Sequence, residues 1–328
     1  MKRRRLLVSL AAGAIAPLAS LAQAPGKVWR VGFLLVRHVD FVDSDYVYGP
    51  FTQSMRELGY VVGKNLVIEW RSSEGDTSRL PELAAELVRL KVNILATAGT
   101  PASIAAQQAT TAIPIVMINV ADPVGAGLVK SLARPGGNST ALSNMGAELG
   151  PKLLEILHSM VPRLKRVAVL VNPSNSVIAI FLKNIQAAAQ KIGVKIHPVE
   201  ASTPGEITSA FALMTRQNVE ALIVPLDGLF TTQRTQIVEL AARRRLPSIS
   251  ANSEFTDAGG LMSYGQNNSE NFTRAAIYVD KILKGAKAGE LPVEQPTTFE
   301  LVINMKTANA LGLKVPQAIL IQVTKVIE

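Results

Sequence analysis

The chain has 328 residues, of which 48% are hydrophobic and 18% are charged. This composition excludes an intrinsically disordered chain, and the length is sufficient for two domains with ordinary cores. The sequence contains no cysteine, which excludes a disulfide framework and leaves the burial of apolar side chains as the source of stability.

A secretory signal is predicted at the start of the chain, over residues 1–24. It has a basic beginning, an apolar stretch from Leu6 to Ala16 and then small residues, with cleavage after Ala22 or Ala24. A membrane anchor is the alternative, but the apolar stretch is shorter than the ~20 residues that a span needs. No cysteine follows it, which excludes a lipid anchor. We therefore expect an exported protein in a Gram-negative periplasm, by either the general or the twin-arginine route.

Part of the formal net charge of +9 lies in this segment. Four positive charges are Lys2, Arg3, Arg4 and Arg5, so removal of the segment changes +9 to about +5. The remaining lysines and arginines are scattered along the chain and form no basic face interleaved with aromatic residues. The sequence therefore predicts no nucleic-acid partner.

The first half of the chain alternates short apolar runs with helical stripes. Apolar runs that end in Gly or Pro turns are typical of buried parallel strands. Strands are predicted at Val28–Val36, Leu66–Trp70, Ile94–Ala98, Ile115–Val120 and Thr140–Ser143, with helices at Pro50–Leu58, Leu80–Val88 and after Gly99. This alternation of strand and helix predicts an α/β fold with right-handed crossovers.

The second half repeats the pattern. Its predicted strands are Arg166–Val171, Val194–Val199, Ala221–Pro225 and Ser248–Ser250, and its helices are Glu148–Met160, Ile178–Ile192, Glu206–Arg216 and Thr232–Arg245. A small-residue strand at 259–265, a helical face at 272–283, a linker at 291–296 and a last strand at 299–303 follow. Two such units predict two Rossmann-like lobes with parallel sheets of about five strands each.

Polar residues stand at the ends of predicted strands in both units. Thr100 and Asp122 follow two strands of the first unit, and Asp227 and Asn252 follow two strands of the second. In an open parallel sheet, ligands bind beyond the carboxyl ends of the strands. We therefore predict that the two lobes face each other across a cleft that holds a ligand.

Five stretches of the sequence are similar to one protein family. They are RELGYVVGKNLVIEWR, RLPELAAELVRLKVNILATAGTPA, AIPIVMINVADPVGAGLVKSLARPGGNSTALSN, AGGLMSYG and FELVINMKTANALGLKVP. Together they resemble the substrate-binding proteins of ABC transporters, in the branch of the type I periplasmic binding fold that includes tryptophan- and tyrosine-binding members. The resemblance implies a monomer that captures a small organic ligand between two hinged lobes and delivers it to an ABC permease in the inner membrane.

The resemblance also implies how the chain is divided. Three segments connect the lobes, with residues 25–143 plus 252–295 in lobe 1 and residues 144–251 plus 296–328 in lobe 2. Periodicity alone does not show this three-segment hinge. The segment Val36–Gly49 departs from the family pattern although it should line the cleft, so the identity of the ligand stays open.

Two opposed groups are the main candidates for ligand binding. On lobe 1, Thr100, Pro101, Ala102 and Ser103 start a predicted helix, and a helix N-terminus favours an anion such as a carboxylate. Capping of that helix by Thr100 is the alternative. On lobe 2, the carboxylate of Asp227 would bind an ammonium group, or would serve as a turn or cap residue. Together the two groups predict an amino-acid-like zwitterion, with an aromatic amino acid as one option.

Further binding candidates lie at strand ends, near the lobe boundaries and in the loop after the first strand: Asp122, Asn144, Asn172, Asn252, Tyr264 and Tyr46. Asp122 begins a frequent turn pair, and Tyr264 would equally pack beneath the hinge. The acidic residues Asp40, Asp43 and Asp45 lack the spacing of a calcium loop. No metal and no cofactor is therefore predicted.

No catalytic constellation is recognisable in the sequence. The histidines His38, His158 and His197 are far apart, and neither a nucleophile elbow nor a Walker phosphate-binding motif occurs. A binding protein without catalytic residues is therefore predicted. An exported enzyme on a doubled Rossmann-like scaffold is the alternative. A sugar-binding regulator of related fold would need a DNA-binding helix pair where the signal stands.

Overall fold

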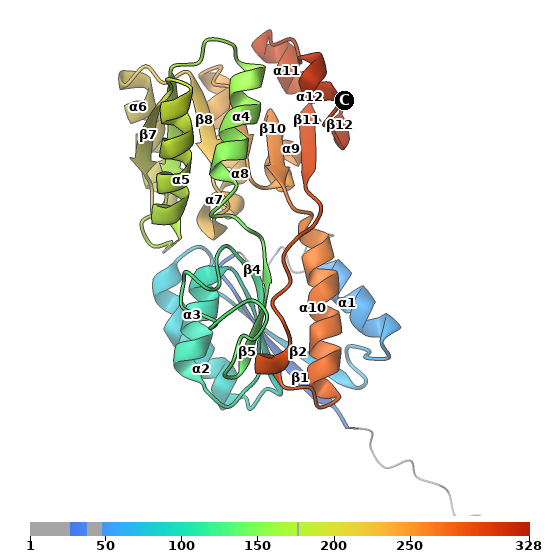
Figure 1. The fold of residues 1–328 in the computed structure, drawn as a ribbon. Coiled ribbons are helices and arrows are strands. Elements are labelled where there is room, and N and C mark those ends of the chain that lie inside the picture. The colour runs from blue at the N-terminus through green and yellow to red at the C-terminus, as the bar shows by residue number, and fades with distance from the viewer. Residues whose placement is uncertain (1–26, 38–47, 176) are drawn as a thin grey trace, which may run out of the picture.

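The computed structural model describes residues 27–37, 48–175 and 177–328, and it consists of two α/β lobes stacked end to end (Figure 1). The predicted signal and Tyr46 lie outside the described residues. Within the described ranges, every helix is too short or too polar to cross a bilayer.

Lobe 1 contains a five-stranded parallel sheet in the order β2-β1-β3-β4-β5. Its strands are β1 (Trp29–Leu35), β2 (Leu66–Ser72), β3 (Ile94–Ala98), β4 (Ile115–Val120) and β5 (Ser139–Ser143). Helices α1 (Tyr48–Glu57) and α10 (Asn268–Leu283) cover one face, and α2 (Leu80–Arg89) and α3 (Thr100–Ala109) cover the other. The strands are apolar throughout because helices cover both faces of the sheet.

Lobe 2 contains a seven-stranded sheet in the order β12-β11-β10-β9-β8-β6-β7. Its strands are β6 (Arg166–Val171), β7 (Lys195–Glu200), β8 (Ala221–Val224), β9 (Ser248–Ser250), β10 (Met262–Gly265), β11 (Glu300–Asn304) and β12 (Lys325–Ile327). All neighbours are parallel except β10 and β11. Strands β6 to β10, the first five of this lobe along the chain, follow the same winding order as the five strands of lobe 1, which confirms the predicted pair of Rossmann-like lobes.

Helices also cover both faces of the second sheet. Helices α4 (Gly150–Met160), α5 (Ile178–Lys191), α11 (Met305–Leu311) and α12 (Gln317–Leu320) pack into one core, and α6 (Pro204–Arg216), α7 (Gly228–Thr232), α8 (Arg234–Arg243) and α9 (Ser253–Asp257) into the other. Short 3-10 turns at Thr77–Arg79 and Ala288–Glu290 complete the described elements.

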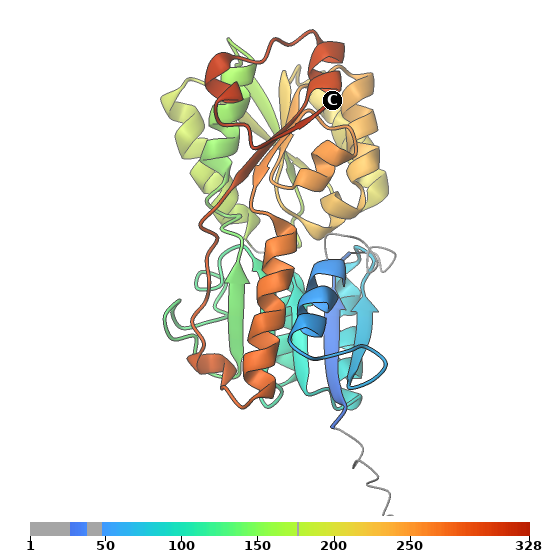
Figure 2. The same cartoon turned by 90° about the vertical axis from the view of Figure 1, so that its right-hand side faces the viewer.

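Three chain segments connect the lobes. The first runs from the end of β5 to α4, the second is Gln266–Asn267 between β10 and α10, and the third leads from the turn after α10 to β11 (Figure 2). The third stays attached to lobe 1 as far as Glu294, because the Ser143 N–H donates to the Glu294 carbonyl at 2.8 Å and the Glu294 N–H donates to the Ala141 carbonyl at 3.1 Å. The hinge in this segment therefore begins after Glu294.

The second crossing lies later in the chain than the resemblance implied. Residues 252–265 were expected in lobe 1, but β10 pairs in parallel with β9 and antiparallel with β11, both in lobe 2. The physical reason is the winding order, since β10 is the fifth strand of the second sheet just as β5 is of the first. Only from α10 onward does the chain return to lobe 1.

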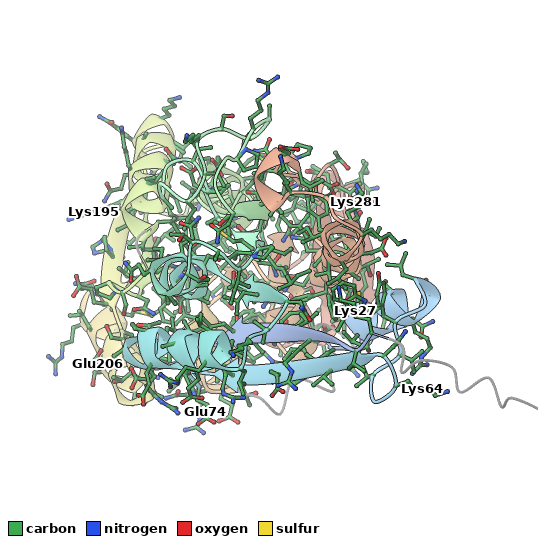
Figure 3. All side chains as sticks on the ribbon, turned by 90° about the horizontal axis from the view of Figure 1, so that it is seen from below. Lys27, Lys64, Glu74, Lys195, Glu206 and Lys281 are labelled. Atoms are coloured by element: carbon green, nitrogen blue, oxygen red, sulfur yellow. The ribbon has the colours of Figure 1, made fainter. Side chains whose placement is uncertain are left out.

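Charged side chains of both signs lie around the outside of the molecule. Figure 3 shows Lys64 and Glu74 of lobe 1, and Lys195 and Glu206 of lobe 2, near the outline of the protein. All four are exposed. The surface charge is therefore mixed along both lobes, as the scattered pattern in the sequence indicated.

Candidate functional site: the cleft between the lobes

A cavity lies between the two lobes at the carboxyl ends of both sheets. Lobe 1 contributes residues that follow β1, β3 and β4, and lobe 2 contributes residues that follow β6, β8 and β9. The polar part of the wall consists of Arg37, Thr77, Thr100, Asn119, Asn144, Asn172, Asn175, Asp227, Thr231, Asn252 and Asn268. This is the position at which open α/β sheets bind ligands.

The lobe 1 side of the cavity presents the N-terminus of α3. Its N-cap is Gly99, which has a φ of 91° and no side chain to cap the helix. The Ser103 N–H donates to the Gly99 carbonyl, whereas the Thr100 and Ala102 N–H groups have no acceptor among the described residues. Free amides at a helix N-terminus attract an anion. The Thr100 hydroxyl accepts from the Ala121 N–H at 3.4 Å, so Thr100 does not cap the helix.

The lobe 2 side presents the carboxylate of Asp227. Asp227 is the N-cap of α7, and its Oδ1 accepts from the Leu229 N–H at 2.9 Å and the Phe230 N–H at 3.3 Å. The amides of Asn172 and Asn175 each donate to its Oδ2, at 3.3 and 3.2 Å. The side chain is therefore both a helix cap and part of the cavity wall.

Burial raises the pKa of the Asp227 carboxyl, and its hydrogen bonds from the two asparagines and two amides oppose this rise. Asp227 takes part in no salt bridge within the described part of the chain. A buried carboxylate that lacks a cation is costly to ionise, and a bound ammonium would remove that cost.

A chain of side-chain amides connects the two sides along the cavity wall. Asn119 donates to Asn268 at 3.3 Å, Asn268 donates to Asn252 at 3.4 Å, and Asn252 donates to Thr231 at 3.3 Å. Asn119 has a φ of 58° and lies at an irregularity of β4, which brings its side chain to the hinge. Its Oδ1 also accepts from Gln266 and from the side chain of Asn271. The wall is therefore fixed at the hinge by carboxamide groups.

The structure places six of the predicted residues in the cavity wall: Thr100, Pro101, Asn144, Asn172, Asp227 and Asn252. Four other predicted residues do not line it. Ala102 is buried in the lobe 1 core, and the Ser103 hydroxyl bonds to Thr97 and to the Gly99 carbonyl. Asp122 forms a turn by accepting from the Gly125 N–H. Tyr264 stacks on Phe299 beside the third crossing.

Several wall residues were missed by the sequence analysis. Asn119 interrupts an otherwise apolar run, which was the one available signal for it. Asn175 and Asn268 lie near helix starts, where a cap is the ordinary interpretation. Thr77 stands in a loop whose side chains are placed by contacts distant in sequence. Arg37 belongs to the segment Val36–Gly49, which was expected to line the cleft, but it was not named as a binding candidate. Tyr46 lies outside the described residues.

The winding order of both sheets and the cleft at their carboxyl ends define a periplasmic-binding type of protein. The family model described as ABC transporter substrate binding protein matches residues 38–327. The chain belongs to this family, which confirms the resemblance found in the sequence and the predicted role of a solute-binding component of an ABC transporter.

Relatives of known sequence or structure agree with this assignment. The tyrosine-binding protein of Clostridioides difficile strain R20291 is 28% identical over 276 residues, 84% of this chain and 79% of that protein. A conserved domain protein from Vibrio cholerae is 26% identical with a TM-score of 0.85, over 92% of this chain and all of the other. An ABC domain from Streptococcus pneumonia in complex with L-Trp is 26% identical with a TM-score of 0.84, at the same coverage.

The arrangement of the lobes can be compared with an open relative. A ligand-free, open substrate-binding protein from Clostridium difficile is 25% identical over 92% of this chain and 99% of its own, yet its TM-score is 0.63. The L-Trp complex has nearly the same identity and coverage and a score of 0.84. The two lobes of the present structure are therefore arranged more like those of the L-Trp complex than those of the open protein.

Proposed function

We propose that the cleft binds the zwitterionic backbone of an amino acid, with its ammonium at Asp227 and its carboxylate at the N-terminus of α3. The observation that carries this proposal is the opposition of the two groups across one cavity. The free amide of Thr100, which lies in the cavity wall, supplies a donor for a carboxylate, and Asp227 supplies a buried acceptor without a cation. Neither group alone would select a zwitterion.

Aromatic amino acids are the first candidates for the ligand. The supporting observations are the tyrosine-binding relative and the relative solved with L-Trp. The described part of the cavity wall contains aliphatic rather than aromatic side chains, and Val36, Val177, Leu226 and Pro101 form its apolar surface. A ring would pack against these residues, and burial of its apolar area would add to the affinity.

Calorimetry with L-tryptophan, L-tyrosine and the other common amino acids tests the proposal. Two truncated analogues make the test sharper, namely tryptamine, which lacks the carboxylate, and indole-3-propionate, which lacks the ammonium. Both should bind at least tenfold more weakly than L-tryptophan, because tryptamine leaves the α3 amides without an acceptor and indole-3-propionate leaves the buried Asp227 carboxylate without a cation. Absence of binding by every amino acid would overturn the proposed ligand class.

The proposal extends to the cellular role of the protein. We propose that the protein is exported to the periplasm after cleavage near Ala22 or Ala24, acts as a monomer and passes its ligand unchanged to an ABC permease. Native mass spectrometry of protein purified from its own periplasm measures the mature N-terminus, the oligomeric state and any retained ligand together. Recovery of a chemically altered ligand would instead support an enzyme.

A further inference from the structure

One ion pair joins the two lobes at the edge of the cleft. Arg37 follows β1 in lobe 1, and Glu254 lies in the first turn of α9 in lobe 2. The guanidinium donates from Nη1 to Oε1 of Glu254 at 3.0 Å and from Nη2 to Oε2, so the contact is bidentate. The side chains of Arg37 and Glu254 are only 13% and 2% exposed. Such a pair is well shielded from solvent and fixed in geometry.

The backbone beside this pair also contacts the opposite lobe. A Cβ atom on Gly228 of lobe 2 would lie 2.5 Å from Cγ1 of Val36 in lobe 1, so the lobes are in close contact here and a side chain at position 228 would clash. The Ser72 hydroxyl donates to the Arg37 carbonyl, and the Gly75 N–H donates to the Val36 carbonyl at 2.7 Å. These bonds fix Val36 and Arg37 to lobe 1, so contacts of both residues with lobe 2 depend on how the lobes are arranged.

The ion pair lies away from the first crossing on the lobe 1 side. In the first sheet, β3 and β4 separate β1 from β5, at whose end the first crossing begins. Three strand spacings of about 4.8 Å place the end of β1 roughly 14 Å from that strand. An opening motion that moves the end of β1 away from α9 would separate Arg37 from Glu254 and expose both charges to water.

We infer that Arg37 and Glu254 form an inter-lobe clasp that stabilises the closed arrangement of the cleft and slows release of the ligand. The inference rests on the proposal that the ligand is held between the lobes. Glu254 is buried when the lobes are closed, and its charge is compensated there by the bidentate guanidinium. Arg37 also lines the cavity, so the clasp lies directly beside the site.

The consequence concerns the rate of release more than the rate of capture. When one partner of a buried, hydrogen-bonded charge pair is removed, the other charge remains buried and unpaired in the closed state. Such a change acts mainly on the dissociation rate. The open state loses nothing, because each charge is hydrated there.

The test measures the affinity and dissociation rate of L-tryptophan for Arg37→Gln, Glu254→Gln and the double variant. Each single substitution should weaken binding by about tenfold or more through faster dissociation, and the double variant should bind no more weakly than either single one. If only Arg37→Gln weakens binding, Arg37 contacts the ligand itself and the clasp is refuted. Unchanged affinity in all three variants also refutes it.

Arg71→Gln is the matched control, because Arg71 pairs with Glu86 at 2.7 Å entirely within lobe 1. It should leave affinity unchanged.

If the wild type binds no amino acid, the proposed ligand class fails and the clasp is tested by small-angle scattering of the ligand-free proteins. Both single variants should then have a larger radius of gyration than the wild type and the charge-reversed pair Arg37→Glu, Glu254→Arg. Equal radii would overturn the clasp.

Discussion

The loops after the third strand of each lobe occupy equivalent places in the two sheets but have opposite electrostatics. In lobe 1, β3 ends at Gly99, whose left-handed φ of 91° starts α3 without a side-chain cap. In lobe 2, β8 leads to Asp227, whose carboxylate caps α7. One loop therefore offers unpaired N–H groups to the cavity, and the other offers a negative charge.

This difference shows how one fold, used twice, makes a polar site. The winding order places both loops at the same cavity, and a single residue at the start of each helix decides the sign of the charge. A glycine leaves the amides of α3 for a ligand, whereas an aspartate uses the amides of α7 itself. Substitutions that change one loop should therefore affect one end of a zwitterion and not the other.

The largest effect is expected from Asp227→Asn. The substitution removes the charge that would pair with the ligand ammonium, and we expect affinity for L-tryptophan to fall about 100-fold or more, as for loss of a buried charge partner. Tryptamine binding should fall equally, whereas indole-3-propionate binding should not fall. Calorimetry with the three compounds measures this.

A capping control is needed because Asp227 also caps α7. Thr203→Ala removes the cap of α6 in the same lobe, where Oγ1 accepts from the Glu206 N–H at 3.3 Å. It should cost about 1 kcal/mol of stability and leave affinity unchanged. Equal losses of affinity in the two variants would mean that Asp227 acts through the helix and not through the ligand.

A somewhat smaller effect is expected from Gly228→Ala, which leaves Asp227 and the α3 amides in place but prevents the two lobes from approaching each other. The added Cβ would lie 2.5 Å from Val36 Cγ1 across the lobe boundary, so the cleft could not close fully. We expect affinity for L-tryptophan to fall about thirtyfold, with little change in the unfolding temperature, since the clash occurs only between lobes. Titration calorimetry and thermal unfolding measure the two quantities.

Gly205→Ala is the matched control for this substitution. Gly205 also lies in the first turn of a lobe 2 helix, but a Cβ there would meet no atom within 4 Å. Its affinity should equal that of the wild type. Wild-type affinity in Gly228→Ala would show that the close approach of Val36 and Gly228 is not required for binding.

The sequence was sufficient for those features that depend on local pattern. The strands are continuous apolar runs, and their ends identified Thr100, Asp227, Asn172 and Asn252 as wall residues. Asn119 was not predicted as a wall residue because it lies inside a strand and reaches the hinge through an irregular backbone position. Nothing local distinguishes a wall residue of that kind from a strand residue.

Features that depend on distant pairing could not be predicted. Arg37 and Glu254 are 217 positions apart, and neither belongs to a recognisable motif. The small-residue run at 259–265 carries no local signal that assigns it to one sheet, and only its pairing with β9 and β11 places it in lobe 2. The predicted crossing at residue 252 was wrong for this reason.

Thr100→Asp tests the other loop and should have an effect of about tenfold. An acidic side chain in the first turn of a helix is compatible with the helix dipole, so α3 should remain folded. Its carboxylate would compete with the ligand carboxylate for the free amides and repel it. Binding of L-tryptophan should therefore weaken about tenfold, as expected for the loss of roughly 1.4 kcal/mol, while tryptamine binding should not weaken. The same loss for both compounds would mean that the cavity shape, not the charge, has changed.

The smallest effect is a pH dependence of ligand affinity, which should arise from the Asp227 loop and not from the loop that starts α3. Burial raises the pKa of Asp227 above its ordinary value of 3.8, so the ligand-free folded state keeps a proton that the unfolded chain releases. The contribution of Asp227 to stability therefore falls as the pH rises from 3.8 through the raised pKa.

A bound ammonium favours the ionised carboxylate, so affinity for tryptamine should rise over the same pH window. The rise is at most about tenfold per pH unit, because one proton is released on binding. Calorimetry between pH 4 and 8 on the wild type and Asp227→Asn measures it, and the variant should show no such rise. Indole-3-propionate, which would contact only the α3 amides, should not share it. A flat profile for tryptamine in the wild type would mean that its ammonium lies elsewhere in the cleft, because no other carboxyl group in the described cavity wall could supply this titration.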